Sequence, residues 1–190
     1  MPNIVLARHC QTDWNVEQRI QGQSDRPLNT DGLHQAGQLA KCLRDDTNIR
    51  IKAIVTSDLR RAHETALIIG ETIQVPRAAI HSDCRYRECH YGALEGLTRN
   101  EVLERLSGRD PYEDTFEKTY DYSPFGGEDR SRVLARNLEA LQEHCASLVE
   151  QADAHLLVIG HGRSLGTLLS HFGLPFRLDQ GTYQVLNVTI

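Results

Sequence analysis

The sequence predicts an α/β fold, a three-layer α/β/α sandwich in which helices cover both faces of a mostly parallel central sheet. Short apolar runs typical of strands alternate along the chain with segments of helical periodicity. No linker, internal repeat or low-complexity tract interrupts this alternation. We therefore expect a single domain over residues 1–190, a length that can bury one sizeable core.

Five apolar runs are predicted to form the strands of the sheet. They lie at residues 3–7, 51–56, 79–81, 155–160 and 184–190. The third run is weak, and the last is rich in β-branched residues, which favour strands.

Four segments between the strands have the periodicity of amphipathic helices. In the first, Leu33, Ala36, Ala40 and Leu43 recur at helical spacing, and Thr30 is the expected N-cap. The other three lie at 59–72, 129–151 and 163–172. Residues 85–125 depart from the pattern because they are polar, irregular and rich in aromatics. We expect this stretch to be an insertion, either a packed surface element or a cover over a pocket.

The composition narrows the classes of partner. A net charge of −5 and a pI near 6.0 give no bulk attraction to nucleic acid or to an anionic membrane. No apolar run is long enough to span a membrane, and the N-terminus does not resemble a signal peptide. The 5 cysteines lack C-x-x-C spacing, which favours reduced thiols in the cytoplasm. Cys84, Cys89 and His90 have an unusual spacing for zinc and no second pair follows, so we expect no metal site.

Basic residues follow three of the predicted strands, at the edge of the sheet where ligands bind in this fold class. They are Arg8 and His9 after the first strand, Arg60 and Arg61 after the second, and His161 and Arg163 after the fourth. One such residue alone is more often structural or solvated. Three strand ends with the same chemistry predict an anion site, and arginine matches the oxygens of phosphate. A neutral histidine there can attack phosphorus.

Phosphoryl transfer also requires a proton for the leaving oxygen. Glu88, in "RECHYGALEG", is the carboxyl candidate if residues 85–125 cover the site. Its position alone is more typical of an exposed loop acid.

Together these segments resemble the histidine phosphatase superfamily, which has the phosphoglycerate mutase-like fold. "RHCQTDWN" is similar to the family's opening R-H-G-x-T-x-x-N, and "QGQSDRPLNTDGLHQA" is similar to the loop that follows it. The family pattern continues, in order, with the arginine of "RRA", the glutamate before "YGALEG", a "GGE" element at 126–128 and a His-Gly pair at 161–162. The resemblance covers nearly the whole chain.

The resemblance implies a role for each matched residue. His9 is the expected nucleophile that forms a phosphohistidine, and Glu88 is the expected proton donor and then the base for water. Arg8, Arg61 and His161 are expected to hold the phosphoryl oxygens. The residues expected near the substrate are Asn15, Gln21, Gly22, Tyr91 and Gly162. No metal or organic cofactor is implied.

Two positions depart from the family pattern. Cys10 stands where the family has glycine. We expect it to adopt an ordinary φ and to turn its thiol away from the phosphate, while Arg8 favours its thiolate. Gly166 stands where many members carry an arginine, so we expect one positive contact fewer.

Two other hydrolase mechanisms are excluded, one by the order of the residues and one by their spacing. "GRSLG" matches the G-x-S-x-G of serine hydrolases, but no acid and histidine follow Ser164 in the required order. The thiol phosphatases need an arginine six residues after a cysteine, and no cysteine of this chain has one.

Within the family, we expect a metal-independent phosphatase that hydrolyses a small phosphomonoester metabolite. The alternative is phosphoglycerate mutase-type transfer between hydroxyls of one substrate. Mutases carry a longer insertion with basic residues for a second acidic group, whereas residues 109–121 are short and acidic here. A third possibility, a non-catalytic binder of phosphoproteins, is disfavoured by the intact set of matched residues. The expected partner is a small phosphorylated metabolite, with no nucleic acid and no membrane, and the sequence leaves a homodimer open.

Overall fold

The computed structural model of the protein describes residues 3–108, 119–146 and 154–186. Five strands form one sheet in the order β3-β2-β4-β1-β5. Four run parallel, and the fifth is antiparallel to its neighbour: β1 (Asn3–Arg8), β2 (Ile51–Thr56), β3 (Ile80–Ser82) and β4 (His155–Gly160), then β5 (Tyr183–Leu186). The predicted mostly parallel sheet is confirmed.

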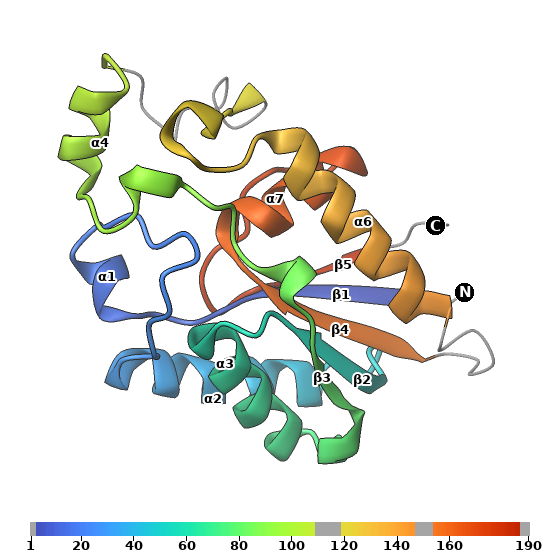
Figure 1. The fold of residues 1–190 in the computed structure, drawn as a ribbon. Coiled ribbons are helices and arrows are strands. Elements are labelled where there is room, and N and C mark those ends of the chain that lie inside the picture. The colour runs from blue at the N-terminus through green and yellow to red at the C-terminus, as the bar shows by residue number, and fades with distance from the viewer. Residues whose placement is uncertain (1–2, 109–118, 147–153, 187–190) are drawn as a thin grey trace.

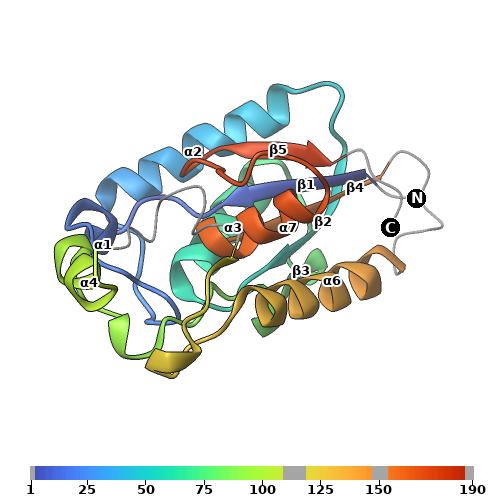
Figure 2. The same cartoon turned by 90° about the horizontal axis from the view of Figure 1, so that it is seen from above.

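Four long helices cover the two faces of the sheet (Figure 1, Figure 2), namely α2 (Thr30–Asp45) and α3 (Arg60–Thr72) on one face, α6 (Arg130–Ala146) and α7 (Gly162–His171) on the other. Successive residues of β1 alternate between the two cores. Val5 and Ala7 belong to the core that includes α2 and α3, and Ile4 and Leu6 belong to the core that includes α6 and α7. The strand is therefore buried on both sides, as expected of a parallel sheet between two helical layers.

The start of α2 corrects one sequence prediction. The N-cap is Asn29 rather than Thr30, because Asn29 is extended and its side chain accepts a hydrogen bond from the backbone N–H of Gly32 at 2.8 Å. Leu33, which the periodicity assigned to the buried face, is 49% exposed. Gly32 packs there instead, at a point where a Cβ would lie 2.0 Å from the Gln11 carbonyl oxygen.

The predicted ends of two elements lie outside the described residues. The helix predicted at 129–151 is described as Arg130–Ala146, and the strand predicted at 184–190 is described as Tyr183–Leu186. None of the described helices is long and apolar enough to cross a membrane. That residues 1–190 form one domain stays a prediction.

Shorter elements gather beyond the carboxyl ends of β1 and β4 (Figure 1). They are α1 (Asp13–Val16), η3 (Gly92–Leu94), α4 (Arg99–Arg105) and η4 (Ser123–Phe125), while η1 (Arg77–Ala79) and η2 (Cys84–Tyr86) flank β3. A third apolar cluster, with Ile20, Leu94, Val102, Tyr120 and Tyr122 among its members, holds this layer together. The described part of residues 85–125 thus shares a small core with Ile20 and with Val133 of α6.

Candidate active site

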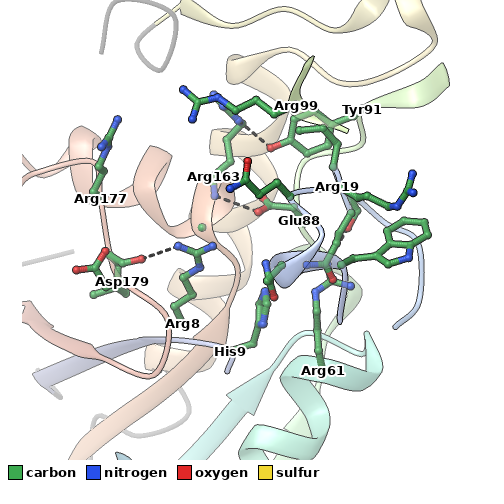
Figure 3. Close-up of a pocket in the computed structure, with 18 of the residues that line it drawn as sticks. Arg8, His9, Arg19, Arg61, Glu88, Tyr91, Arg99, Arg163, Arg177 and Asp179 are labelled. Atoms are coloured by element: carbon green, nitrogen blue, oxygen red, sulfur yellow. Dashed lines mark hydrogen bonds between the residues drawn. The ribbon is translucent and has the colours of Figure 1, made fainter. Parts of the chain in front are cut away.

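The register of the sheet places the two predicted histidines side by side. Arg8 of β1 pairs with Gly160 of β4, so His9 and His161 each follow their strand at the same edge. Both are buried, and their ring centroids lie 5.0 Å apart. His9 lies between Arg8 and Arg61 in the cavity (Figure 3). Burial, reinforced by the positive charge of Arg61, holds the pKa of both histidines well below the usual 6.5. Both rings are therefore neutral at pH 7.

The backbone determines which ring nitrogen of His9 is available. Nδ1 lies 2.7 Å from the carbonyl oxygen of Cys10. A carbonyl oxygen only accepts, so Nδ1 carries the hydrogen and donates it. Nε2 then holds the lone pair, which is the form of imidazole that attacks phosphorus.

Arg61 and Arg8 bring positive charge to the histidines. Arg61, in the first turn of α3, is 1% exposed and donates to the carbonyl oxygens of Ser24 at 2.9 Å and Gly22 at 2.8 Å. Burial lowers the pKa of Arg61 to about 10, which still leaves it protonated at neutral pH. Arg8 is half-buried at the end of β1 and donates to the carbonyl oxygen of Leu178 at 3.1 Å.

Buried polar atoms without a partner cluster around these groups. Within the described residues they are Nε of Arg8, Nε of Arg61, both ring nitrogens of His161 and Oε1 of Gln21. A buried donor or acceptor that makes no hydrogen bond costs about 1–3 kcal/mol. The donors among them are Nε of Arg8, Nε of Arg61 and the one N–H of the neutral His161 ring. Three unused donors at one place are typical of a site that binds an oxygen-rich anion.

Glu88 reaches the same cavity from residues 85–125 and is held by the start of α7. Its Oε1 accepts from the backbone N–H groups of Ser164 at 2.9 Å and Cys89 at 2.8 Å, and its Oε2 accepts from that of Arg163 at 3.1 Å. Only 8% of Glu88 is exposed, so it is not the exposed loop acid that its position alone suggested. The N-terminus of a helix is a favourable place for a carboxylate.

The five residues predicted near the substrate all line this cavity: Asn15, Gln21, Gly22, Tyr91 and Gly162. Gly22 has a φ of +53°, a conformation that favours glycine. A Cβ on Gly162 would lie 3.1 Å from the guanidinium carbon of Arg8, so glycine lets that side chain lie against the backbone.

The cavity has a volume of about 440 Å³, and several of its lining residues were not predicted. They are Trp14, Arg19, Arg99, Phe176 and Arg177. These residues come from short helices and loops, and no local pattern identifies them. Arg163, which the sequence placed at a strand end beside His161, also lines the cavity.

The structure bears on both departures from the family pattern. Cys10 has no positive φ, and its side chain lies in the core with Ala36 and Leu39, as expected. The expectation of a thiolate was wrong, because burial raises the pKa of Cys10 to about 11. At Gly166, a Cβ would lie 2.3 Å from the carbonyl oxygen of Phe176, so an arginine does not fit there.

Among the described residues, no three His, Cys, Asp or Glu side chains are grouped so that they could hold a metal ion. Of the weak zinc candidates, Cys84 is exposed and Cys89 is buried.

The sequence was compared with known proteins. Residues 4–187 match the family described as the histidine phosphatase superfamily (branch 1). A probable phosphoglycerate mutase GpmB of Serratia proteamaculans is 37% identical over 181 residues, which are 92% of this chain and 77% of that protein. A glucosyl-3-phosphoglycerate phosphatase of Mycobacterium tuberculosis is 34% identical over 170 residues, which are 87% of this chain and 72% of that protein.

Solved structures have the same fold. The mycobacterial glucosyl-3-phosphoglycerate phosphatase in complex with VO3 superposes with a TM-score of 0.83 at 30% identity, over 98% of this chain and 93% of that one. Bacillus stearothermophilus YhfR superposes with a TM-score of 0.79 at 30% identity, over 100% of this chain and 92% of that one. The conjunction of fold, site and sequence match means that this chain belongs to branch 1 of the histidine phosphatase superfamily.

Proposed function

We propose that the protein is a metal-independent phosphatase of small phosphomonoesters and that His9 is its nucleophile. The observation that carries this proposal is the state of His9. Its ring is neutral, its Nδ1 hydrogen is donated to the Cys10 carbonyl, and its Nε2 keeps the lone pair beside two arginines. This is the arrangement that nucleophilic attack on a phosphate ester requires.

The first chemical step transfers the phosphoryl group to His9. Nε2 forms a bond to phosphorus while the bond from phosphorus to the ester oxygen breaks, and its electron pair leaves with that oxygen. Glu88, in its acid form, gives its proton to the leaving oxygen. Arg8, Arg61 and His161 donate hydrogen bonds to the phosphoryl oxygens, and those donors stabilise the charge that develops on them.

The second step returns the enzyme to its starting state. Water attacks phosphorus, the bond to Nε2 breaks, and the Glu88 carboxylate takes a proton from the attacking water. The products are inorganic phosphate and the acid form of Glu88. Each proton that Glu88 gives in the first step is therefore recovered in the second.

Hydrolysis of p-nitrophenyl phosphate without added metal tests the proposal. We expect turnover that survives treatment with a chelator. A screen of phosphorylated metabolites for release of phosphate then identifies the substrate. No hydrolysis of any phosphate ester by the folded protein would contradict the proposal and would favour a non-catalytic binder of phosphorylated partners.

A mutase remains the second candidate, because arginines other than the predicted set line the cavity. Arg19, Arg99 and Arg177 could face a second acidic group of a substrate. Residues 109–121, whose short and acidic sequence disfavours a mutase, lie outside the described residues from 109 to 118. Interconversion of 2- and 3-phosphoglycerate, measured with and without 2,3-bisphosphoglycerate, distinguishes the two. Mutase turnover of about 10 per second, a typical enzyme value, would replace the phosphatase proposal.

A cytoplasmic location stays a prediction.

A further inference from the structure

Arg136 of α6 binds the backbone of the segment that carries Glu88. Its Nη1 donates to the carbonyl oxygens of Arg85 at 2.6 Å and Arg87 at 2.7 Å, and its Nη2 donates to that of Glu88 at 3.0 Å. One guanidinium thus collects three carbonyl groups from neighbouring residues. The Glu88 carbonyl also accepts from Nε2 of Gln23 at 3.2 Å, whereas Arg136 is the donor to the carbonyls of Arg85 and Arg87.

Glu128 fixes the orientation of this guanidinium. Its Oε1 accepts from Arg136 Nε and its Oε2 accepts from Arg136 Nη2, both at 2.9 Å. Such a bidentate pair sets the plane of the arginine. Glu128 also binds the chain just after Glu88, because its Oε2 accepts from the backbone N–H of His90 at 2.9 Å and its own N–H donates to the His90 carbonyl at 2.8 Å.

Glu88 is therefore held from two directions. Its backbone is bound to Arg136 and its carboxylate accepts from the first amides of α7. Arg136 and Glu128 do not line the cavity, and their charged groups are bound to each other and to backbone groups of the segment around Glu88. They are also partly shielded, with side chains 17% and 18% exposed, which strengthens their pairing relative to a surface ion pair.

We propose that Arg136 and Glu128 are positioning residues, which hold Glu88 where it can give its proton to the leaving oxygen. This inference rests on the proposed function, in which Glu88 is the acid. Loss of the Arg136 contacts leaves the Arg85 and Arg87 carbonyls without this donor and the Glu88 carbonyl with Gln23 alone, which lets the segment shift. A misplacement of about 1 Å is enough to cost on the order of 10²-fold in rate.

The test compares two esters that differ in their need for a proton. Phenyl phosphate has a basic leaving group that needs an acid, whereas 2,4-dinitrophenyl phosphate has a leaving group that departs without one. The ratio kcat/KM covers the reaction up to phosphoryl transfer, so it reports the step in which Glu88 acts as acid. Arg136→Met should lower kcat/KM for phenyl phosphate roughly tenfold or more, a part of the ~10²–10⁴ that acid catalysis supplies. For the dinitrophenyl ester the loss should stay below about threefold, since no acid catalysis is removed.

Two further variants and one control make the result specific. Glu128→Gln keeps Arg136 but weakens its pairing, and Arg136→Lys keeps the charge but cannot reach all three carbonyls, so each should show the same ester dependence at smaller size. These two carry the test if Arg136→Met does not fold. Arg132→Met makes the same chemical change at an exposed position of the same helix and should leave both esters unchanged.

The Glu88→Gln variant distinguishes a failure of the proposed acid role of Glu88 from a failure of the positioning role of Arg136 and Glu128. If Glu88→Gln lowers kcat/KM for both esters alike, Glu88 is not the acid, and the proposed mechanism and this inference are both overturned. If Glu88→Gln affects phenyl phosphate selectively while the Arg136 and Glu128 variants lower both esters alike or neither, only the positioning role is overturned. Selective loss in all of them supports it.

Discussion

The inner and outer parts of the cavity are built in different ways. We call the inner lining residues Arg8, His9 and Arg61, with the buried His161 beside His9, the floor, and Arg19, Arg99 and Arg177 the rim. The floor residues follow strands or open a helix, and they are buried or half-buried. The rim residues come from α4 and from loops, and two of the three are exposed. On the proposed function, we expect the residues that the sheet positions to carry the chemistry and the short elements beyond it to select the substrate.

The largest effect should come from the floor nucleophile. His9→Ala removes Nε2, and we expect turnover to fall by several orders of magnitude, because the covalent route is lost. Phosphate on the wild-type protein should be trappable as an acid-labile, base-stable adduct that is absent from the variant. Retention of more than a few per cent of the activity would show that His9 is not the nucleophile.

Substitution of a floor arginine should lower the activity much more than substitution of a rim arginine. Arg61→Met removes a buried guanidinium that the proposed mechanism uses as a donor to the phosphoryl group, and we expect kcat for p-nitrophenyl phosphate to fall on the order of 10²–10³-fold. Arg177→Met should change kcat/KM for the same ester by less than about tenfold, since an exposed cation contributes little to a substrate with one anionic group. A larger rim effect should appear with 3-phosphoglycerate. Equal losses for both variants with p-nitrophenyl phosphate would contradict the division into floor and rim.

The floor residues could be predicted from the sequence, whereas the rim residues could not. His9, Arg61 and His161 were predictable because the carboxyl ends of parallel strands meet at one edge, whatever the length of chain between them. Their roles came from the family resemblance and not from spacing. Arg99 and Arg177 were not predictable, because their place depends on how short helices and loops pack around the third apolar cluster. Arg136 was not predictable either, since a helix surface arginine carries no sign that it binds carbonyl groups of another segment.

The buried histidines of the floor should also make the free energy of unfolding of the protein depend on pH. The pKa values of His9 and His161 are well below 6.5 in the folded protein and return to about 6.5 on unfolding. The unfolded chain therefore binds more protons below pH 6.5, and the free energy of unfolding falls as the pH is lowered. Each histidine contributes a slope of up to about 1.4 kcal/mol per pH unit in that range.

Urea unfolding from pH 7 down to pH 5 measures this slope. His161→Asn should make it shallower by the contribution of one histidine, because the variant has one fewer group to protonate on unfolding. His34→Asn is the matched control, since His34 is exposed on α2. An unchanged slope in His161→Asn, or an equal change in His34→Asn, would be inconsistent with a buried neutral histidine in the floor.

The smallest effect on activity is expected at Cys10, although it is adjacent to the nucleophile. Its contribution to His9 is the backbone carbonyl that accepts the Nδ1 hydrogen, and any residue at this position supplies that group. Its thiol lies in the core with a pKa of about 11, so it is neither a nucleophile nor easily oxidised. Cys10→Gly and Cys10→Ser should therefore keep hydrolysis within about tenfold of wild type, a change of roughly 1.4 kcal/mol or less in the barrier.

Stability should change more than activity in Cys10→Ser, because a hydroxyl is harder to remove from water than a thiol, and the hydrogen bond of this side chain with Thr65 offsets only part of that cost. Thiol labelling gives an independent measurement. Cys42 and Cys84 are exposed and should react first, while Cys10 should react only as the protein unfolds. If Cys10→Ser lost activity as completely as His9→Ala, or if Cys10 were labelled first, the thiol would face the substrate and take part in the chemistry. The carbonyl oxygen of residue 10 would then not be its only contribution to the floor.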